Sequence, residues 1–349
     1  MVIFACAGCA EKWNLLNGCP SRVKDLPNKF DKYVVVSGGY VKNKKVVLFY
    51  NTMFNMPLQY DKADIPEEFE ISTDRRLLQE ASAVVFHIPS LFSSLDKISR
   101  FVPSIYSMAL SLERLRKKRN QIWVAWFMEC EVNIPHFRKS SFLNAFDLIM
   151  SHHLDADIVT PYFYYELNDL LRRPVREKVD GKNVCAFISS PFHKSGRLDY
   201  LKTLMNYLDI HSYGKVLRNK IIEKDIGRQT KLDILANYKF TIAFENAIAK
   251  DYVTEKFYDP LIAGSVPIYL GAPNINEFAP GDKCFIDVNS FDGPESLAKY
   301  LISVSEDNEL YQSYFSWKTN NFRNSFLNLI EQNKEHAFVR LCKKLQEIT

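Results

Sequence analysis

The chain has 349 residues, a length that predicts two domains or one large α/β unit. Its residues are 47% hydrophobic and 25% charged, which excludes disordered and collagen-like chains. Forty-five basic and 41 acidic residues leave a net charge of +4, a balance that argues against nucleic acid as a partner.

Short apolar runs rich in Val, Ile and Phe recur along the chain, with helical patterns between them. The runs are continuous rather than alternating, which is typical of parallel strands buried on both faces. We therefore predict an α/β fold with an open parallel sheet. The predicted strands are 46–50, 83–88, 122–127, 184–188, 240–244 and 266–270, and predicted helices include 107–118, 198–208 and 296–304.

The segment 166–182 is basic, contains Pro174 and Gly181, and lacks an apolar period. We interpret it as a linker between an N-terminal α/β domain, residues 1–165, and a C-terminal α/β domain, residues 183–349. A ligand is expected in the cleft between the domains, at the carboxyl ends of strands.

Several well-known motifs are absent. The sequence contains no Gly-x-Gly-x-x-Gly after a strand, no Gly-x4-Gly-Lys-Ser/Thr and no Gly-x-Ser-x-Gly, so dehydrogenase, P-loop and serine hydrolase functions have no support. Cys6 and Cys9 have metal-ligand spacing, but no second Cys or His pair follows at a suitable distance.

Two short polar clusters lie between the predicted strands and the linker. The adjacent His152 and His153 are interpreted as a surface pair. Asp155 and Asp157 could hold a divalent cation that bridges a nucleotide diphosphate, but a turn or helix-capping role is favoured because Asp-x-Asp is common by chance.

Residues 238–271 are the most informative stretch and are predicted as strand, polar loop, helix, stop and strand. The first strand ends at Phe244. Glu245 and Asn246 therefore follow at the sheet edge where α/β proteins bind ligands.

The helix in this stretch is predicted to begin after a cap at Asp251 or Thr254 and to stop at Gly264. Free N–H groups at its start, beside Lys256, favour an anion such as a diphosphate. Pro260 predicts a kink or an early end. The predicted buried stripe is Val253, Phe257 and Leu261.

A second cation supports the anion site. Arg197 follows the strand 184–188 and opens another helix, where its guanidinium could reach the same phosphate. On local sequence alone, Arg197 could equally be a surface residue, and Glu255 with Lys256 could be a solvated pair.

The run Phe244-Glu-Asn-Ala-Ile-Ala-Lys-Asp-Tyr-Val-Thr-Glu-Lys256, with Ala263-Gly-Ser-Val-Pro-Ile-Tyr-Leu-Gly271, closely resembles the signature of the α1,3-fucosyltransferases, glycosyltransferase family ten. Segments on both sides are similar to the family as well, and the resemblance extends over roughly residues 45–345. Upstream similar pieces include Ser72-Thr-Asp-Arg75 and Trp123–Glu129, and a downstream one is Tyr311–Lys318.

The resemblance implies a GT-B-like fold, in which two Rossmann-like α/β domains face each other across a cleft. It implies that the C-terminal domain binds GDP-β-L-fucose and that fucose is transferred with inversion to a glycan hydroxyl. The implied acceptor is a GlcNAc-containing glycan or glycoprotein, attacked through its 3-OH by single displacement.

The resemblance also implies roles for individual residues. Glu255 and Lys256 match positions that bind the ribose and the diphosphate, and Arg197 matches an arginine that neutralises the charge of the diphosphate. Glu129 matches the proposed catalytic base. The remaining matched donor-binding positions are Ser189, Glu245, Asn246 and Tyr252.

Glu131 is a rival base, because on a strand it would share the face of Glu129. Local sequence leaves the two open, and the family pattern favours Glu129. General-base catalysis is worth ~10²–10⁴-fold in rate.

Arg197, Lys256 and a helix N-terminus would offset the negative charge on GDP. No metal is therefore strictly required, although a divalent cation could stimulate transfer.

The chain departs from the family pattern at several positions. Cys130 and Glu131 replace a usual Ser-Pro, and Asp259-Pro260 replaces a common Asn-Ala. Ile71 stands where animal members carry a disulfide cysteine, and Cys342 lacks its usual partner.

These departures leave alternatives open. The chain could be a catalytically silent relative that binds nucleotide or glycan, or it could use another GDP-sugar or form another linkage. Family resemblance predicts a Golgi luminal domain, joined to a membrane only through an anchor absent from this chain. The missing cysteines, sequons and apolar spans favour instead a soluble intracellular protein.

Overall fold

The computed structural model describes residues 44–53, 56–91, 115, 117–134, 140–162 and 166–348. Contacts divide these residues into two compact units. One comprises the described residues up to Pro161 together with those from Glu335 onward, and the other comprises Tyr162–Lys334. Cys6, Cys9 and most of the predicted helix 107–118 lie outside the described residues.

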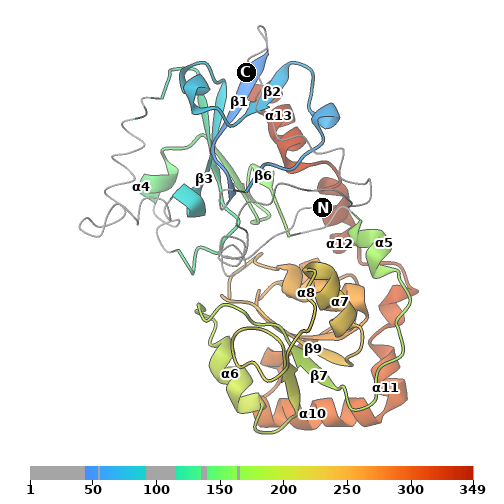
Figure 1. The fold of residues 1–349 in the computed structure, drawn as a ribbon. Coiled ribbons are helices and arrows are strands. Elements are labelled where there is room, and N and C mark those ends of the chain that lie inside the picture. Colours follow the sequence, from blue (N-terminus) through green and yellow to red (C-terminus); the bar gives the residue numbers. More distant parts are fainter. Residues whose placement is uncertain are drawn as a thin grey trace, which may run out of the picture. The chain divides into compact units, whose positions relative to one another are not determined.

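The first unit contains a six-stranded sheet in the order β2-β1-β3-β4-β5-β6, with every strand pair parallel (Figure 1). Strands β1, β3 and β4 confirm three predicted strands, whereas β2, β5 and β6 are too short to stand out in the sequence. The strands are β1 (Lys45–Asn51), β2 (Phe69–Ser72), β3 (Ala83–His87), β4 (Ile122–Trp126), β5 (Leu148–Ser151) and β6 (Ile158–Val159). Short helices are η2 (Lys62–Asp64), η3 (Arg75–Gln79) and α4 (Ser140–Leu143).

Both faces of this sheet are covered, as its continuous apolar strands require. On one face, Phe86 and Trp123 pack against Phe146. On the other face, Phe49 and Trp126 pack against Phe338 of α13 (Ala337–Ile348), with ring centroids 4.5 and 5.8 Å away. Helix α13 therefore groups with the first unit, whereas the predicted division placed all of residues 183–349 in one C-terminal domain.

The second unit contains a five-stranded parallel sheet in the order β11-β10-β9-β7-β8 (Figure 1). The predicted strands 184–188, 240–244 and 266–270 are confirmed as β7, β9 and β10. The strands are β7 (Val184–Ala186), β8 (Ile210–Ser212), β9 (Phe240–Phe244), β10 (Val266–Leu270) and β11 (Ile286–Asp287).

Helices cover both faces of this second sheet. Helices α6 and α10 overlap the predicted helices 198–208 and 296–304. They contact each other, and their buried side chains join a core that contains Phe240, Ile242 and Phe244. Helices α7 and α8 contact each other, and α8 contacts β9 and β10. The helices are α5 (Leu167–Leu171), α6 (Arg197–Leu204), α7 (Arg228–Leu235), α8 (Glu255–Ala263), α9 (Ile275–Phe278), α10 (Pro294–Glu306), α11 (Asn308–Ser313) and α12 (Asn324–Gln332), with 3-10 turns η5 (Val288–Ser290) and η6 (Ser316–Lys318).

Helix α8 forms largely as the sequence predicts. Thr254 is its N-cap, Gly264 ends it with a φ of 72°, and the predicted stripe is at most 2% exposed. The predicted early end at Pro260 is wrong, because the helix continues through this residue to Ala263. No helix among the described residues combines the length and apolar content that a bilayer crossing needs.

The segment that follows α5 is tied to the second unit by a buried lysine. The Lys318 ammonium donates hydrogen bonds to the carbonyls of Leu171 at 2.7 Å, and of Arg173 and Leu261 at 3.3 Å. Leu171 and Arg173, which belong to the predicted linker 166–182, are therefore held by defined contacts.

Replacement of Lys318 by Met should lower the free energy of unfolding by about 1–3 kcal/mol, because buried carbonyls lose their donor. Urea unfolding followed by circular dichroism measures the change. Lys299→Met is the matched control, because Lys299 is exposed and pairs with Glu295 of its own helix, and this variant should change stability by less than about 0.5 kcal/mol. Equal losses in both variants would contradict the role of Lys318.

Candidate functional site

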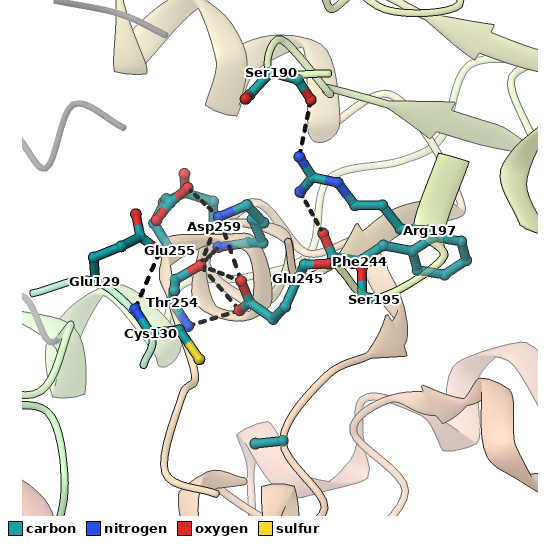
Figure 2. A network of polar contacts seen from close by, with 12 residues as sticks. Glu129, Cys130, Ser190, Ser195, Arg197, Phe244, Glu245, Thr254, Glu255 and Asp259 are labelled. Atoms are coloured by element: carbon teal, nitrogen blue, oxygen red, sulfur yellow. Dashed lines mark hydrogen bonds and ion pairs between the residues drawn. The ribbon is translucent and has the colours of Figure 1, made fainter. Parts of the chain in front are cut away.

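A fully buried carboxylate lies at the carboxyl end of β9. Glu245 is 0% exposed, and its oxygens accept hydrogen bonds from the Thr254 N–H at 2.8 Å and from the Thr254 hydroxyl at 2.9 Å. Figure 2 shows these contacts, which join the strand end to the start of α8. A buried carboxylate needs such donors, since an unpaired charge would be strongly destabilised.

Lys256 completes this arrangement. Its ammonium donates to the Thr254 hydroxyl at 2.9 Å and to Glu255 at 3.1 Å, and it lies 3.4 Å from a Glu245 oxygen. Burial raises the pKa of Glu245 above its ordinary value, although the Lys256 charge acts in the opposite direction. The protein's own carboxylate thus occupies part of the predicted anion site at the helix start.

Glu255 and Lys256 are not a solvated surface pair, because each side chain is only 19% exposed. Burial alone would raise the pKa of Glu255, but the ammonium groups of Lys256 and Lys231 together bring it below the ordinary value. Glu255 is therefore an ionised carboxylate at neutral pH, able to accept hydrogen bonds from hydroxyl groups.

One turn further along α8, Asp259 is 1% exposed and paired with two cations of α7. It accepts from the Arg228 guanidinium at 2.9 and 3.1 Å and from the Lys231 ammonium at 2.9 Å. These bonds hold α7 against α8 and place the Lys231 charge near Glu255. No local pattern predicts these contacts, because the two partners of Asp259 lie 28 and 31 residues away in the sequence.

Arg197 is buried, with 2% exposure, so it is not a surface arginine. Its guanidinium donates to the carbonyl of Phe244 at 3.2 Å and to that of Ser190 at 3.1 Å, and Figure 2 shows it spanning the two carbonyls. The Ser195 hydroxyl donates to the Glu245 carbonyl at 2.7 Å. The start of α6 is thereby fixed to the carboxyl end of β9.

The loop between β9 and α8 carries two further predicted positions. The Asn246 carbonyl accepts from the Lys194 N–H at 2.7 Å, and Tyr252, 3% exposed, packs edge-on against Tyr162 with centroids 5.9 Å apart. Asp251 adopts a φ of 64° and exchanges hydrogen bonds with Asn274 at 2.8 and 2.9 Å. These hydrogen bonds offset the cost of the left-handed backbone conformation at Asp251.

Close packing around Glu245 also requires a glycine. A Cβ on Gly271 would lie 2.3 Å from the Tyr269 hydroxyl and 2.7 Å from Cγ of Glu245. Any residue with a Cβ at position 271 would therefore clash with Tyr269 and Glu245. Glycine lets the backbone lie this close to the buried carboxylate.

The structure brings all the predicted donor-binding residues into one unit. Ser189 lies in the loop between β7 and α6, and the others lie at the start of α6, in the loop that follows β9, or at the start of α8. Since β7 and β9 are parallel neighbours, this is one sheet edge, the usual place for a ligand in an α/β protein. The supporting residues that sequence reasoning did not identify are Ser195, Arg228, Lys231 and Asn274.

The predicted base belongs to the first unit. Glu129 follows β4, and one of its oxygens accepts from the Asn133 amide at 2.9 Å and from the Cys130 N–H at 3.1 Å. Cys130 is a buried free thiol, and burial raises its pKa to about 12, so it is not nucleophilic at neutral pH.

The rival base, Glu131, is engaged by a histidine. One of its oxygens lies 3.2 Å from Nε2 of His153. Burial alone would raise the pKa of Glu131, but the His153 hydrogen bond and neighbouring charges lower it to about 2. The interpretation of His152 and His153 as a surface pair is wrong for His152, which is 1% exposed.

In the Asp155-x-Asp157 segment, Asp155 lies in a turn, which is one of the two structural roles predicted for this pair. Both residues are exposed, and an oxygen of Asp157 accepts from the Ile149 N–H at 2.7 Å. This bond caps the backbone at the start of β5.

Solved structures share the fold described above. A crystal structure of an α1,3-fucosyltransferase with GDP-fucose aligns over 90% of this chain and 93% of its own, with a TM-score of 0.56 and 13% identity. A second α1,3-fucosyltransferase structure gives the same TM-score at 15% identity. This likeness confirms the predicted GT-B-like α/β fold class.

Two family models match consecutive parts of the chain. The model "Fucosyltransferase, N-terminal" matches residues 42–163, and "Glycosyltransferase family 10 (fucosyltransferase) C-term" matches residues 177–349. The chain therefore belongs to glycosyltransferase family 10, the fucosyltransferases, as its signature segment predicted.

Curated relatives agree with this assignment. A fucosyltransferase-like protein of Arabidopsis thaliana is 35% identical over 56% of this chain. The 4-galactosyl-N-acetylglucosaminide 3-alpha-L-fucosyltransferase 9 of Mus musculus is 30% identical over 71% of this chain. The chain spans 37% of the plant relative and 63% of the mouse relative.

Proposed function

We propose that this protein is an inverting fucosyltransferase that moves L-fucose from GDP-β-L-fucose to the 3-OH of GlcNAc in a glycan or glycoprotein. The observation that carries the proposal is the Glu245–Thr254–Lys256 network at the carboxyl end of β9, flanked by Glu255 and Arg197. The family, whose members include a 3-alpha-L-fucosyltransferase that acts on a 4-galactosyl-N-acetylglucosaminide, supports the same reaction.

The donor-binding residues suit a nucleotide diphosphate. Lys256 would exchange one of its protein partners for a phosphate oxygen, and Glu255 would accept hydrogen bonds from ribose hydroxyls. Arg197 would add a second positive charge as GDP leaves. Glu245, Asn246, Tyr252 and Ser189 would complete the donor site, with Glu245 near the fucose.

On the acceptor side, we propose Glu129 as the general base. It would take the proton of the acceptor hydroxyl as that oxygen attacks the anomeric carbon and the bond to GDP breaks. Glu131 is less suited, because a pKa of about 2 makes it a weak base and His153 already engages it. The Asn133 amide would hold the Glu129 carboxylate in place.

Transfer needs no metal in this proposal, since Arg197 and Lys256 offset the charge on the leaving group. Activity should therefore persist substantially in EDTA, although added cations could stimulate it. Fucose transfer measured with and without EDTA checks this expectation. Complete loss of activity that manganese restores would instead favour Asp155 and Asp157 as cation ligands.

The most direct test is incubation with GDP-fucose and a panel of N-glycan core, LacNAc and type 1 acceptors, followed by determination of the product linkage. We expect α1,3-linked fucose on GlcNAc. A product with another linkage, or transfer from another GDP-sugar only, would change the assigned specificity. GDP binding without any transfer would indicate a silent relative.

A further inference from the structure

Two neighbouring strands of the first unit lead into side chains that can ligate metals. Strand β4 is followed by Glu131, and strand β5 ends at Ser151, directly before His152 and His153. Because β4 and β5 are parallel partners, their carboxyl ends lie at the same edge of the sheet. One ligand atom from each of the three side chains lies within 4.8 Å of the other two.

The distances suit a small divalent ion. A tetrahedral centre with ligand bonds of about 2.0–2.1 Å has ligand atoms about 3.3 Å apart. The Glu131 oxygen and Nε2 of His153 are 3.2 Å apart, so an ion could bind both without moving the loops. A separation of 3.2 Å suits a direct hydrogen bond between Glu131 and His153, and it also suits two ligands of one metal ion.

The types of the three ligand side chains indicate which metal ion would bind. Two imidazoles and one carboxylate are typical ligands of Zn²⁺ and similar ions, and such sites leave a fourth position for water. Mg²⁺ and Ca²⁺ prefer oxygen ligands alone.

Both ligand-bearing loops are ordered by backbone hydrogen bonds. The Asn133 N–H donates to the Cys130 carbonyl at 3.0 Å, and the Thr160 N–H donates to the Ser151 carbonyl at 2.6 Å. His152 is buried, whereas the Glu131 and His153 side chains remain 17% and 31% exposed. An ion would therefore reach a largely preformed site from the solvent side.

We propose that Glu131, His152 and His153 form a binding site for a divalent cation of the Zn²⁺ class. The cation would cross-link the loops that follow β4 and β5, one of which also carries Glu129. It takes no part in the transfer step proposed above, and the inference does not depend on that function.

Isothermal titration calorimetry with Zn²⁺ and with Co²⁺ tests the site on the full chain. We expect the wild type to bind one more ion than Glu131→Gln or His153→Asn, or to bind it at least about tenfold more tightly. Both altered residues are partly exposed, and circular dichroism verifies that the variants fold. Bound Co²⁺ should show the visible bands of a tetrahedral site, and Zn²⁺ should raise the midpoint of thermal unfolding.

Glu67→Gln is the matched control, because Glu67 is an exposed carboxylate of the same unit that belongs to neither group of candidate metal ligands among the described residues, and it should bind like the wild type. Mg²⁺ should not compete. Cysteine thiolates can also bind Zn²⁺, but that background is the same in every variant. Binding that is absent in the wild type, or unchanged in both Glu131→Gln and His153→Asn, would overturn the proposal.

Discussion

Replacement of Glu129 by Gln should lower kcat for fucose transfer by about 10²–10⁴-fold, the usual contribution of a general base. The substitution keeps the shape of the side chain and leaves an oxygen that can still accept from Asn133 and Cys130. It removes the negative charge and, with it, the ability to take a proton. GDP affinity, measured by calorimetry, should stay within about twofold, because the predicted donor-binding residues belong to the other unit.

Glu131→Gln is the informative comparison for this experiment. Glu131 is already a weak base, with a pKa of about 2, so its loss should reduce kcat far less than the loss of Glu129. Both variants are assayed in EDTA, so that no cation contributes to the difference. Full turnover by the Glu129 variant, or a larger defect in the Glu131 variant, would refute the assignment of the base.

The sequence predicted the strand and the helix that carry the proposed donor-binding residues, because the signals for these elements are local. The apolar run that ends at Phe244 places Glu245 at a strand end, and Thr254 caps a helix whose buried stripe recurs every four residues. Such patterns depend on neighbours within one or two turns, which a single sequence displays directly.

Other features depend on contacts between distant segments. Phe338 groups α13 with the first unit because it meets Phe49 and Trp126, a pairing without any local pattern. Asp259 likewise finds its cations on α7.

The burial of His152 was missed for a different reason. Strand β5 has only four residues, too few to reveal that the next side chain turns into the protein. Of the two outcomes predicted for Pro260, a kink or an early end, the early end is wrong, because the helix continues to its glycine cap. The free-energy cost of one missing N–H at Pro260 is smaller than the stabilisation from burying the apolar side chains around it.

Replacement of Lys256 by Ala should weaken the binding of GDP and GDP-fucose by about 10- to 150-fold. A hydrogen bond to a charged group is worth about 1.5–3 kcal/mol, and each 1.4 kcal/mol changes the dissociation constant tenfold. Calorimetry with GDP measures the effect without any requirement for turnover. Lys250→Ala is the matched control, because Lys250 is an exposed lysine in the loop that leads into α8, and this variant should bind GDP normally.

Loss of Lys256 also removes a cation beside the buried Glu245, so a general disturbance of the site must be distinguished from a lost phosphate contact. Lys256→Arg provides this distinction, since it keeps the positive charge for both partners and should recover much of the affinity. Thermal unfolding of each variant monitors the stability of the second unit. Unchanged GDP affinity in a folded Lys256→Ala protein would show that this ammonium remains with Glu245, Glu255 and Thr254 and does not bind the diphosphate.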